Sequence, residues 1–279
     1  MDSHFRAFSF VDRITRLGPG DSIRGQYTIP PTLDAFPASL VAEAVGQLAA
    51  WAAMATVRCS HRPVAGIAGT IELLSAVHPG QVLDLAAELE SVDTETVGYG
   101  GSAHADGIPV IRLLDCVGPM LPVEDFDDPQ SVRDRLPFLR TVGAAPGGFD
   151  GLPALALDPC GGERDRVARA RLHVPAAAPF FADHFPRRPV FPGTLLMHAS
   201  LQAAALLATP ATSANGGAWM PRTVSDVKLR TFISPGETLS LEARRIGHSD
   251  SSLAIAVESR IKQRLVGSAE ILFCPALNL

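Results

Sequence analysis

Two long apolar runs dominate the hydrophobic pattern of the chain. Residues 39–57 are almost wholly apolar, with Glu43 as the only charge and Gln47 as a polar neighbour, and residues 194–208 repeat the pattern. Runs of this length without a polar face predict helices that are buried on all sides. In residues 251–261, by contrast, Leu253, Ile255 and Val257 recur at every second position, which predicts a strand.

The sequence around the two runs is also repeated. FPASL at 36–40 matches FPGTL at 191–195, and VHPGQVLDL at 77–85 matches ISPGETLSL at 233–241. Phe191 follows Phe36 by 155 residues, and Gly236 follows Gly80 by 156. Two distant pairs with nearly the same offset indicate an internal duplication.

Each copy predicts a strand, a long helix and then antiparallel strands. In the first copy we expect strands at 23–29, 67–77, 82–92, 96–105 and 110–117. In the second copy we expect them at 166–174, 224–233, 238–246, 253–261 and 265–273. The fold class is therefore α+β, a sheet wrapped around a long helix in each half. We predict domains at 1–123 and 149–279, joined by a surface connector at 124–148 that is rich in Gly and Pro.

Composition narrows the class of protein. Hydrophobic residues make up 47% of the chain and charged residues 19%, which favours a large core and argues against disorder. A net charge of −5 without a basic stripe argues against nucleic-acid binding. The scattered cysteines predict reduced thiols, and the histidines have no metal-ligand spacing, so we expect no metal site. Because the sequence shows no signal-peptide pattern, we expect a cytoplasmic location. Residues 39–57 approach the length of a membrane span, but they lack flanking anchors, so we expect no membrane span.

The most specific signal lies at residues 180–193, which read FFADHFPRRPVFPG. This run resembles the FFxGHFPxxPVMPG signature of the 3-hydroxyacyl-(acyl carrier protein) dehydratases of fatty acid synthesis, and it matches at nine positions. That family has the hotdog fold, in which a sheet wraps around a long central helix. The resemblance therefore implies two tandem hotdog domains that form a pseudo-dimer.

Two positions depart from the family pattern. Asp183 stands where the family has glycine, and His198 stands where it has an acidic residue, five positions after the motif glycine. The offset of 155 places Glu43 at the acid position of the first half and Ile29 at its histidine position. In the family, the histidine and acid of one site come from opposite subunits. The resemblance thus implies one composite site, built from His184 and Glu43, and a dead reciprocal pair.

The chemistry of these groups suits dehydration of a 3-hydroxyacyl thioester, which needs a base and an acid. His184 suits the base because neutral imidazole is available at about pH 7. Glu43 suits the acid because burial in an apolar helix favours the protonated carboxyl group. Gly193, at the start of a helix, is expected to offer its N–H to the thioester oxygen, and Gln47 is expected to orient Glu43. The expected supporting residues are Phe181, Phe185 and Phe191.

The resemblance also implies partners. The substrate would be carried on the phosphopantetheine of an acyl carrier protein, with no further cofactor. A ketosynthase or other pathway enzymes and a second copy of the chain are further candidate partners. Basic residues near the expected mouth are candidate contacts for the acidic carrier, although a solvated basic face explains them equally well. They are Arg187, Arg188, Lys228 and Arg230.

Two other functions stay open at this point. Hotdog proteins also hydrolyse acyl thioesters, so the first alternative is a thioesterase. The second is a non-catalytic subunit that binds acyl chains or completes a heteromeric dehydratase. Fold analogy does not decide among these functions, but the motif around His184 favours the dehydratase.

Overall fold

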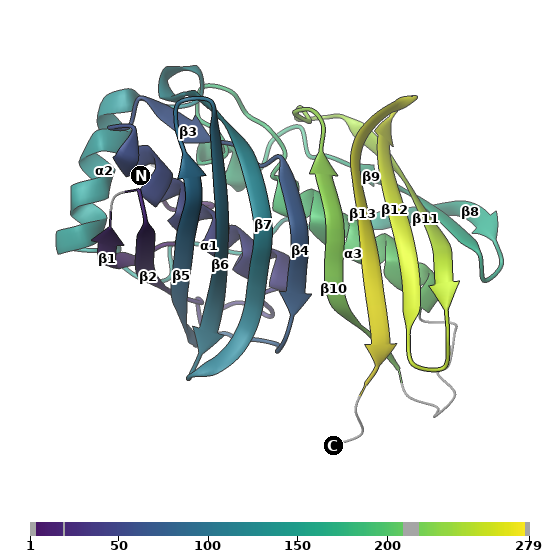
Figure 1. Ribbon diagram of the computed structural model, residues 1–279. Coiled ribbons are helices and arrows are strands. Elements are labelled where there is room, and N and C mark those ends of the chain that lie inside the picture. Colours follow the sequence, from purple (N-terminus) through teal and green to yellow (C-terminus); the bar gives the residue numbers. More distant parts are fainter. Residues whose placement is uncertain (1–3, 19, 209–217, 277–279) are drawn as a thin grey trace.

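The computed structural model describes residues 4–18, 20–208 and 218–276, and it consists of two similar halves (Figure 1). The first half contains β1 (Arg13–Gly18), β2 (Ser22–Thr28), α1 (Ala38–Thr56), β3 (His61–Pro63), β4 (Ile67–Leu73), β5 (Val82–Val92), β6 (Thr96–Ala105) and β7 (Ile108–Pro122). The connection contains a 3₁₀ turn, η1 (Val123–Asp125), and α2 (Pro129–Thr141). The second half contains β8 (Leu157–Glu163), β9 (Val167–His173), η2 (Pro179–Ala182), α3 (Gly193–Ala208), β10 (Trp219–Leu229), β11 (Thr238–His248), β12 (Leu253–Ile261) and β13 (Arg264–Pro275).

The strands of both halves join into one continuous antiparallel sheet. Their order is β1-β2-β5-β6-β7-β4-β10-β13-β12-β11-β9-β8, and the short β3 pairs separately with β7. The halves meet where β4 pairs with β10, with Ile71 opposite Val224 (Figure 1). Equivalent strands thus meet at the centre of the sheet, as at the interface of a two-fold dimer.

Helices α1 and α3 lie against one face of the sheet and contact each other (Figure 1). Of the 19 residues of α1, 12 are buried, and many of these are alanines. Small side chains let the surrounding strands approach the helix closely, which explains how one sheet wraps around it. Each half is therefore a hotdog, as the sequence predicts.

Helix α1 is long and apolar enough to cross a membrane by length and composition alone. In the fold, 67% of its most apolar 18-residue window is buried inside the protein. The apolar surface of α1 is thus largely covered by the protein's own strands and helices.

The repeated Pro-Gly dipeptides form equivalent turns in the two halves. Gly80 has φ +88° and Gly236 has φ +80°, in the region that favours glycine over other residues. Each turn directly precedes a long strand, β5 or β11, which pairs with β2 or β9. The duplication read from the sequence is therefore also present in the backbone.

The connection between the halves, for which we predict a surface connector at 124–148, contains the helix α2. Asp128 caps this helix by accepting from Ser131 N–H at 2.8 Å, and Pro129 occupies its first turn, where a missing N–H costs nothing. Only Val132 and Leu139 of α2 are buried. Polar residues interrupt its apolar ones, so it lacks the long apolar run that predicts α1 and α3.

Several strand boundaries also differ from the prediction. The strands predicted at 67–77 and 224–233 end earlier, at Leu73 and Leu229, whereas β7 extends on both sides of 110–117. Strands β1, β3 and β8 were not predicted. The sequence of β8 reads LDPCGGE and has no alternation, because its residues are mostly exposed at the edge of the sheet.

Candidate active site

The loop after η2 holds His184 rigidly. The His184 N–H donates to the Phe180 carbonyl at 2.9 Å, and the Val190 N–H donates to the His184 carbonyl at 3.0 Å. The imidazole Nδ1 lies 3.0 Å from the Val190 carbonyl oxygen. Because a carbonyl can only accept, Nδ1 carries the hydrogen. The neutral ring therefore has its free lone pair on Nε2.

Burial favours this neutral ring. Desolvation lowers the pKa of His184 below its ordinary value, and the nearby Arg62 guanidinium lowers it further. The negative charge of Glu43 and the hydrogen bond to Val190 act in the opposite direction. Desolvation is the largest of these effects, so the imidazole is available as a base at neutral pH.

Glu43 comes from α1 in the other half, and both of its carboxyl oxygens have partners. Gln47, one turn later, donates from Nε2 to Oε1 at 2.9 Å. Thr194, at the start of α3, donates from Oγ1 to Oε2 at 2.5 Å. The N–H of the Gln47 amide can only donate, so Oε1 acts as an acceptor and a proton on Glu43 would be carried by Oε2. Because a hydroxyl group can also accept, the Thr194 contact suits the protonated acid as well.

Gly193 begins α3 directly after Pro192. The first N–H groups of a helix have no partner within the helix, and the Gly193 N–H donates no hydrogen bond among the described residues. A Cβ at this position would lie 2.3 Å from Leu229 Cδ1 and 3.4 Å from Ala65 Cβ. Glycine therefore leaves the amide uncovered at the positive end of the helix dipole.

These groups line one cavity between the two halves. Its wall includes Glu43 from the first half and His184, Gly193 and Thr194 from the second. The volume of the cavity is about 200 Å³. Along α1 the lining continues to Met54, 11 residues beyond Glu43, which corresponds to roughly 16 Å of helix. The cavity is thus long and has an acid–base pair in its wall, which suits an acyl chain with a reactive end.

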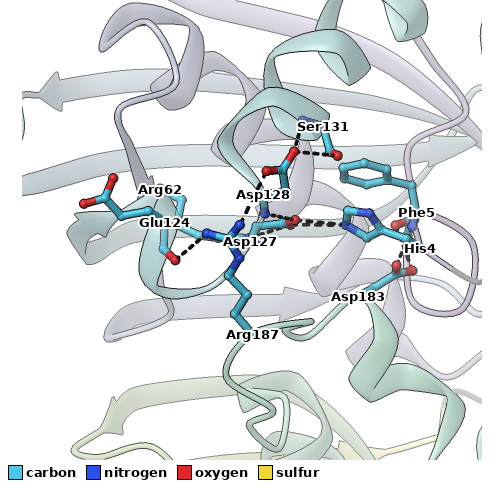
Figure 2. Close-up of polar contacts among 10 residues, drawn as sticks. His4, Phe5, Arg62, Glu124, Asp127, Asp128, Ser131, Asp183 and Arg187 are labelled. Carbon is cyan, nitrogen blue, oxygen red and sulfur yellow. Dashed lines mark hydrogen bonds and ion pairs between the residues drawn. The ribbon is translucent and has the colours of Figure 1, made fainter.

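A buried ion network borders the cavity (Figure 2). Arg62 of β3 lies 3.4 Å from Asp127, which also contacts His4 at 3.2 Å. The guanidinium carbon of Arg62 is 3.9 Å from the centre of the Phe185 ring, next to His184. Arg62 and Asp127 both line the cavity, and no motif or repeat in the sequence marks either residue. Thr194 was also missed, although it directly follows the Pro-Gly of the motif.

The predicted aromatic residues have different surroundings. Phe185 lines the cavity, while Phe181 lies beside the Phe180 ring at 4.5 Å, away from the cavity lining. Phe191 is buried and packs at 6.1 Å from Phe180. Phe181 and Phe191 thus support the loop that carries His184.

The four predicted basic contacts lie outside the cavity lining. Arg187 pairs with Asp128 at 3.4 Å, as Figure 2 shows. Arg188 covers the Phe232 ring at 4.5 Å. Lys228 lies 3.6 Å from Asp226, and Arg230 is exposed. Local partners therefore already engage three of the four side chains.

Ile29 and His198 occupy the reciprocal positions. Ile29 is fully buried, and His198 is half-buried with a pKa lowered by burial. Neither residue lines the cavity that contains Glu43. Phe149, from the connection between the halves, packs 6.3 Å from Phe36, the counterpart of Phe191. An aromatic side chain thus lies against the first half's copy of the motif.

Within residues 4–18, 20–208 and 218–276, no group of three or more His, Cys, Asp or Glu side chains is arranged to hold a metal ion.

The fold is a double hotdog, and Glu43 of one half and His184 of the other line the same cavity. A sequence family described as "ApeI-like: ApeI dehydratase" matches residues 162–267 of the chain. The 3-hydroxyacyl-[acyl-carrier-protein] dehydratase FabZ of Albidiferax ferrireducens is 30% identical over 112 residues, which cover 39% of this chain and 75% of that relative. The chain therefore belongs to the FabZ-type dehydratase family.

Another curated relative and a solved structure are also similar to the chain. The FabZ of Pseudoalteromonas translucida is 30% identical over 96 residues, and the match spans 34% of this chain and 64% of that relative, less than two thirds of its length. Among solved structures, a putative oleoyl thioesterase from Lactobacillus plantarum superposes with a TM-score of 0.59 over 92% of this chain and 97% of its own. Its sequence is 11% identical, so this likeness shows the fold alone.

Proposed function

We propose that the protein dehydrates a 3-hydroxyacyl thioester, carried by an acyl carrier protein, to the trans-2-enoyl thioester in fatty acid or polyketide-type synthesis. The observation that carries this proposal is the single cavity lined by His184 from one half and Glu43 from the other. The family membership supports the same reaction class.

In the proposed reaction, His184 Nε2 removes a proton from C2 of the acyl chain. The electron pair of that C–H bond forms the C2=C3 double bond, and the C3–O bond breaks. Glu43 gives its proton to the departing hydroxyl group, which leaves as water. The Gly193 N–H donates to the thioester oxygen, where negative charge develops. Afterwards His184 holds one proton more and Glu43 one fewer, and exchange with solvent restores both groups.

The neighbouring groups prepare the two residues for these roles. Nδ1 of His184 is held by the Val190 carbonyl, so Nε2 is the nitrogen left to accept the proton. Gln47 and Thr194 fix the carboxyl plane of Glu43. Positioning of this kind lowers the barrier because the groups need no reorganisation during the reaction.

The test uses His184→Ala and Glu43→Gln with a 3-hydroxyacyl thioester, following the absorbance of the enoyl product. Each positioned acid or base typically contributes about 10²–10⁴-fold, so each variant is expected to lose activity within that range at unchanged melting temperature. His198→Ala, at the reciprocal position, is the matched control and should keep most of the activity. Wild-type turnover by Glu43→Gln would show that the acid lies elsewhere.

The same assay distinguishes the alternative functions. A thioesterase releases free thiol, which a thiol reagent detects, whereas a dehydratase leaves the thioester intact. A non-catalytic acyl-binding subunit gives neither product. Comparing carrier-protein and coenzyme A thioesters of the same acyl chain tests whether the carrier itself contributes to binding.

A further inference from the structure

Residues 5–10 run across the composite site, and we call this segment the strap. One end is fastened to the loop of the second half by Asp183. Its carboxylate accepts from the Phe5 N–H, from the Phe8 N–H at 2.7 Å and from the Ser9 hydroxyl at 3.1 Å. Figure 2 shows the contact between Asp183 and Phe5. Three donors thus converge on one side chain from a segment almost 180 residues away.

The other end of the strap is fastened to α1 by Gln47. Its Nε2 donates to the Phe8 carbonyl at 2.9 Å, and its Oε1 accepts from the Phe10 N–H at 2.8 Å. The same Nε2 also donates to Glu43. One amide side chain therefore connects the strap with the proposed acid.

The strap also contacts the proposed base. Asp183 directly precedes His184 in the chain, and the Phe8 ring meets the His184 ring edge-on, with centroids 5.9 Å apart and an interplanar angle of 82°. The strap thus connects the loop of His184 with the helix of Glu43, although these belong to different halves.

The hydrogen bonds that Asp183 accepts suit a residue that holds the strap in place. Burial raises the pKa of this carboxyl group, and its three hydrogen bonds oppose that shift. Hydrogen bonds to an ionised acceptor are stronger than neutral ones, so the carboxylate binds the strap better than a neutral side chain would. A glycine, which the family signature has at this position, offers no side chain to hold the strap.

This arrangement exists at one site of the two. With the offset of 155, the counterpart of Asp183 is Thr28, and the counterpart of Gln47 is Gln202, which is exposed. The reciprocal position therefore lacks both the carboxylate and a covered amide. The strap belongs to the site that has both His184 and Glu43.

We propose that Asp183 is a positioning residue, which fastens the strap and thereby holds His184 and Glu43 in their reacting geometry across the two halves. This inference rests on the proposed dehydration. It assigns a role to the position where the chain departs most clearly from its family signature.

The first experiment compares Asp183→Asn with the wild type. Asparagine keeps the size of the side chain but turns an N–H₂ group toward the strap donors. We expect kcat to fall about 10- to 100-fold because a small misplacement of reacting groups has effects of this size. KM should change much less, since most of the cavity wall comes from residues outside the strap. Asp158→Asn, an equivalent change at an exposed site on β8, should leave both constants unchanged.

Amide hydrogen exchange gives a readout that does not depend on turnover. In Asp183→Asn, exchange should accelerate at residues 5–10 and in the loop at 180–190, while α1 and α3 stay protected. Unchanged protection of residues 5–10 would show that Asp183 does not hold the strap in place. Accelerated exchange together with a wild-type kcat would show that the strap does not position the reacting groups. If the wild type fails to dehydrate the substrate, the proposed function fails, and the exchange result still decides whether Asp183 holds the strap.

A double-mutant cycle with Ser9→Ala separates action through the strap from independent action. Because the Ser9 hydroxyl donates to Asp183, its removal should cost little once Asp183→Asn has weakened the fastening, and the double variant should lose much less than the product of the two single losses. Independent, multiplying losses would contradict the proposal. Ser9→Ala removes one of the three donors and is a milder variant, expected to shift exchange and kcat in the same direction if Asp183→Asn folds poorly.

Discussion

The hydroxyl group of Thr194 makes the sharpest prediction about the site. It lies 2.5 Å from Oε2 of Glu43 and reaches it from the opposite half of the molecule. Thr194→Val keeps the branched shape and removes only the hydroxyl group. In the proposed reaction Glu43 becomes a carboxylate as it gives up its proton, and a hydrogen bond to a charged group typically contributes about 1.5–3 kcal/mol. At about 1.4 kcal/mol per factor of ten, its loss should lower kcat/KM about 10- to 150-fold.

The assay is dehydration of a 3-hydroxyacyl thioester under conditions of low substrate, which reports kcat/KM directly. Thr194→Ser retains the hydroxyl group and should recover most of the activity, which separates the hydrogen bond from the packing of the methyl group. Thermal melting serves as a check on folding in both variants. Activity of Thr194→Val within about threefold of wild type would refute the role assigned to this contact, because the whole predicted range lies above that value.

Three further predictions concern the base, the backbone amide and the number of sites. Because burial lowers the pKa of His184, kcat/KM should rise with pH through a midpoint below the ordinary value of 6.5. Arg62→Met removes a positive charge that disfavours the imidazolium form of His184, so it should move this midpoint to higher pH. A pH–rate profile of each protein measures both effects. Gly193→Ala places a methyl group 2.3 Å from Leu229 Cδ1, so it should cost about 1–3 kcal/mol in denaturant unfolding and also lower kcat; unchanged kinetics would contradict the role of that amide. Calorimetric titration with a tight, unreactive substrate analogue should give one acyl ligand per chain, and a stoichiometry of two would contradict the single composite site.

The parts of the fold that the sequence predicts well are those with strong local signals. Helices α1 and α3 follow from their apolar runs, and the Pro-Gly turns follow from residues that suit positive φ. Strand β8 and helix α2 escape prediction for a shared reason. Strand β8 is largely exposed and only two residues of α2 are buried, so the stability of both elements comes from neighbours that are distant in the sequence.

The same distinction applies to the site. The motif at residues 180–193 identifies His184, and the repeat offset identifies Glu43, so both residues can be predicted from the sequence. Thr194 and Arg62 have no such mark, because their contacts depend on how α3 meets α1 and how β3 approaches the His184 loop. Contacts between the halves are set by the pairing of β4 with β10, and no local pattern records that register.

Joining the two hotdogs in one chain changes what a single substitution does. In a dimer of identical subunits, every substitution appears at both sites, so neither site can change alone. Here Asp183 fastens the strap at one site, while its counterpart in the first half is Thr28, which has no carboxylate. Asp183 thus acts at one place only. In the fused chain, substitutions at one site therefore accumulate independently of the other site, which allows one half to specialise in supporting the chemistry of the other.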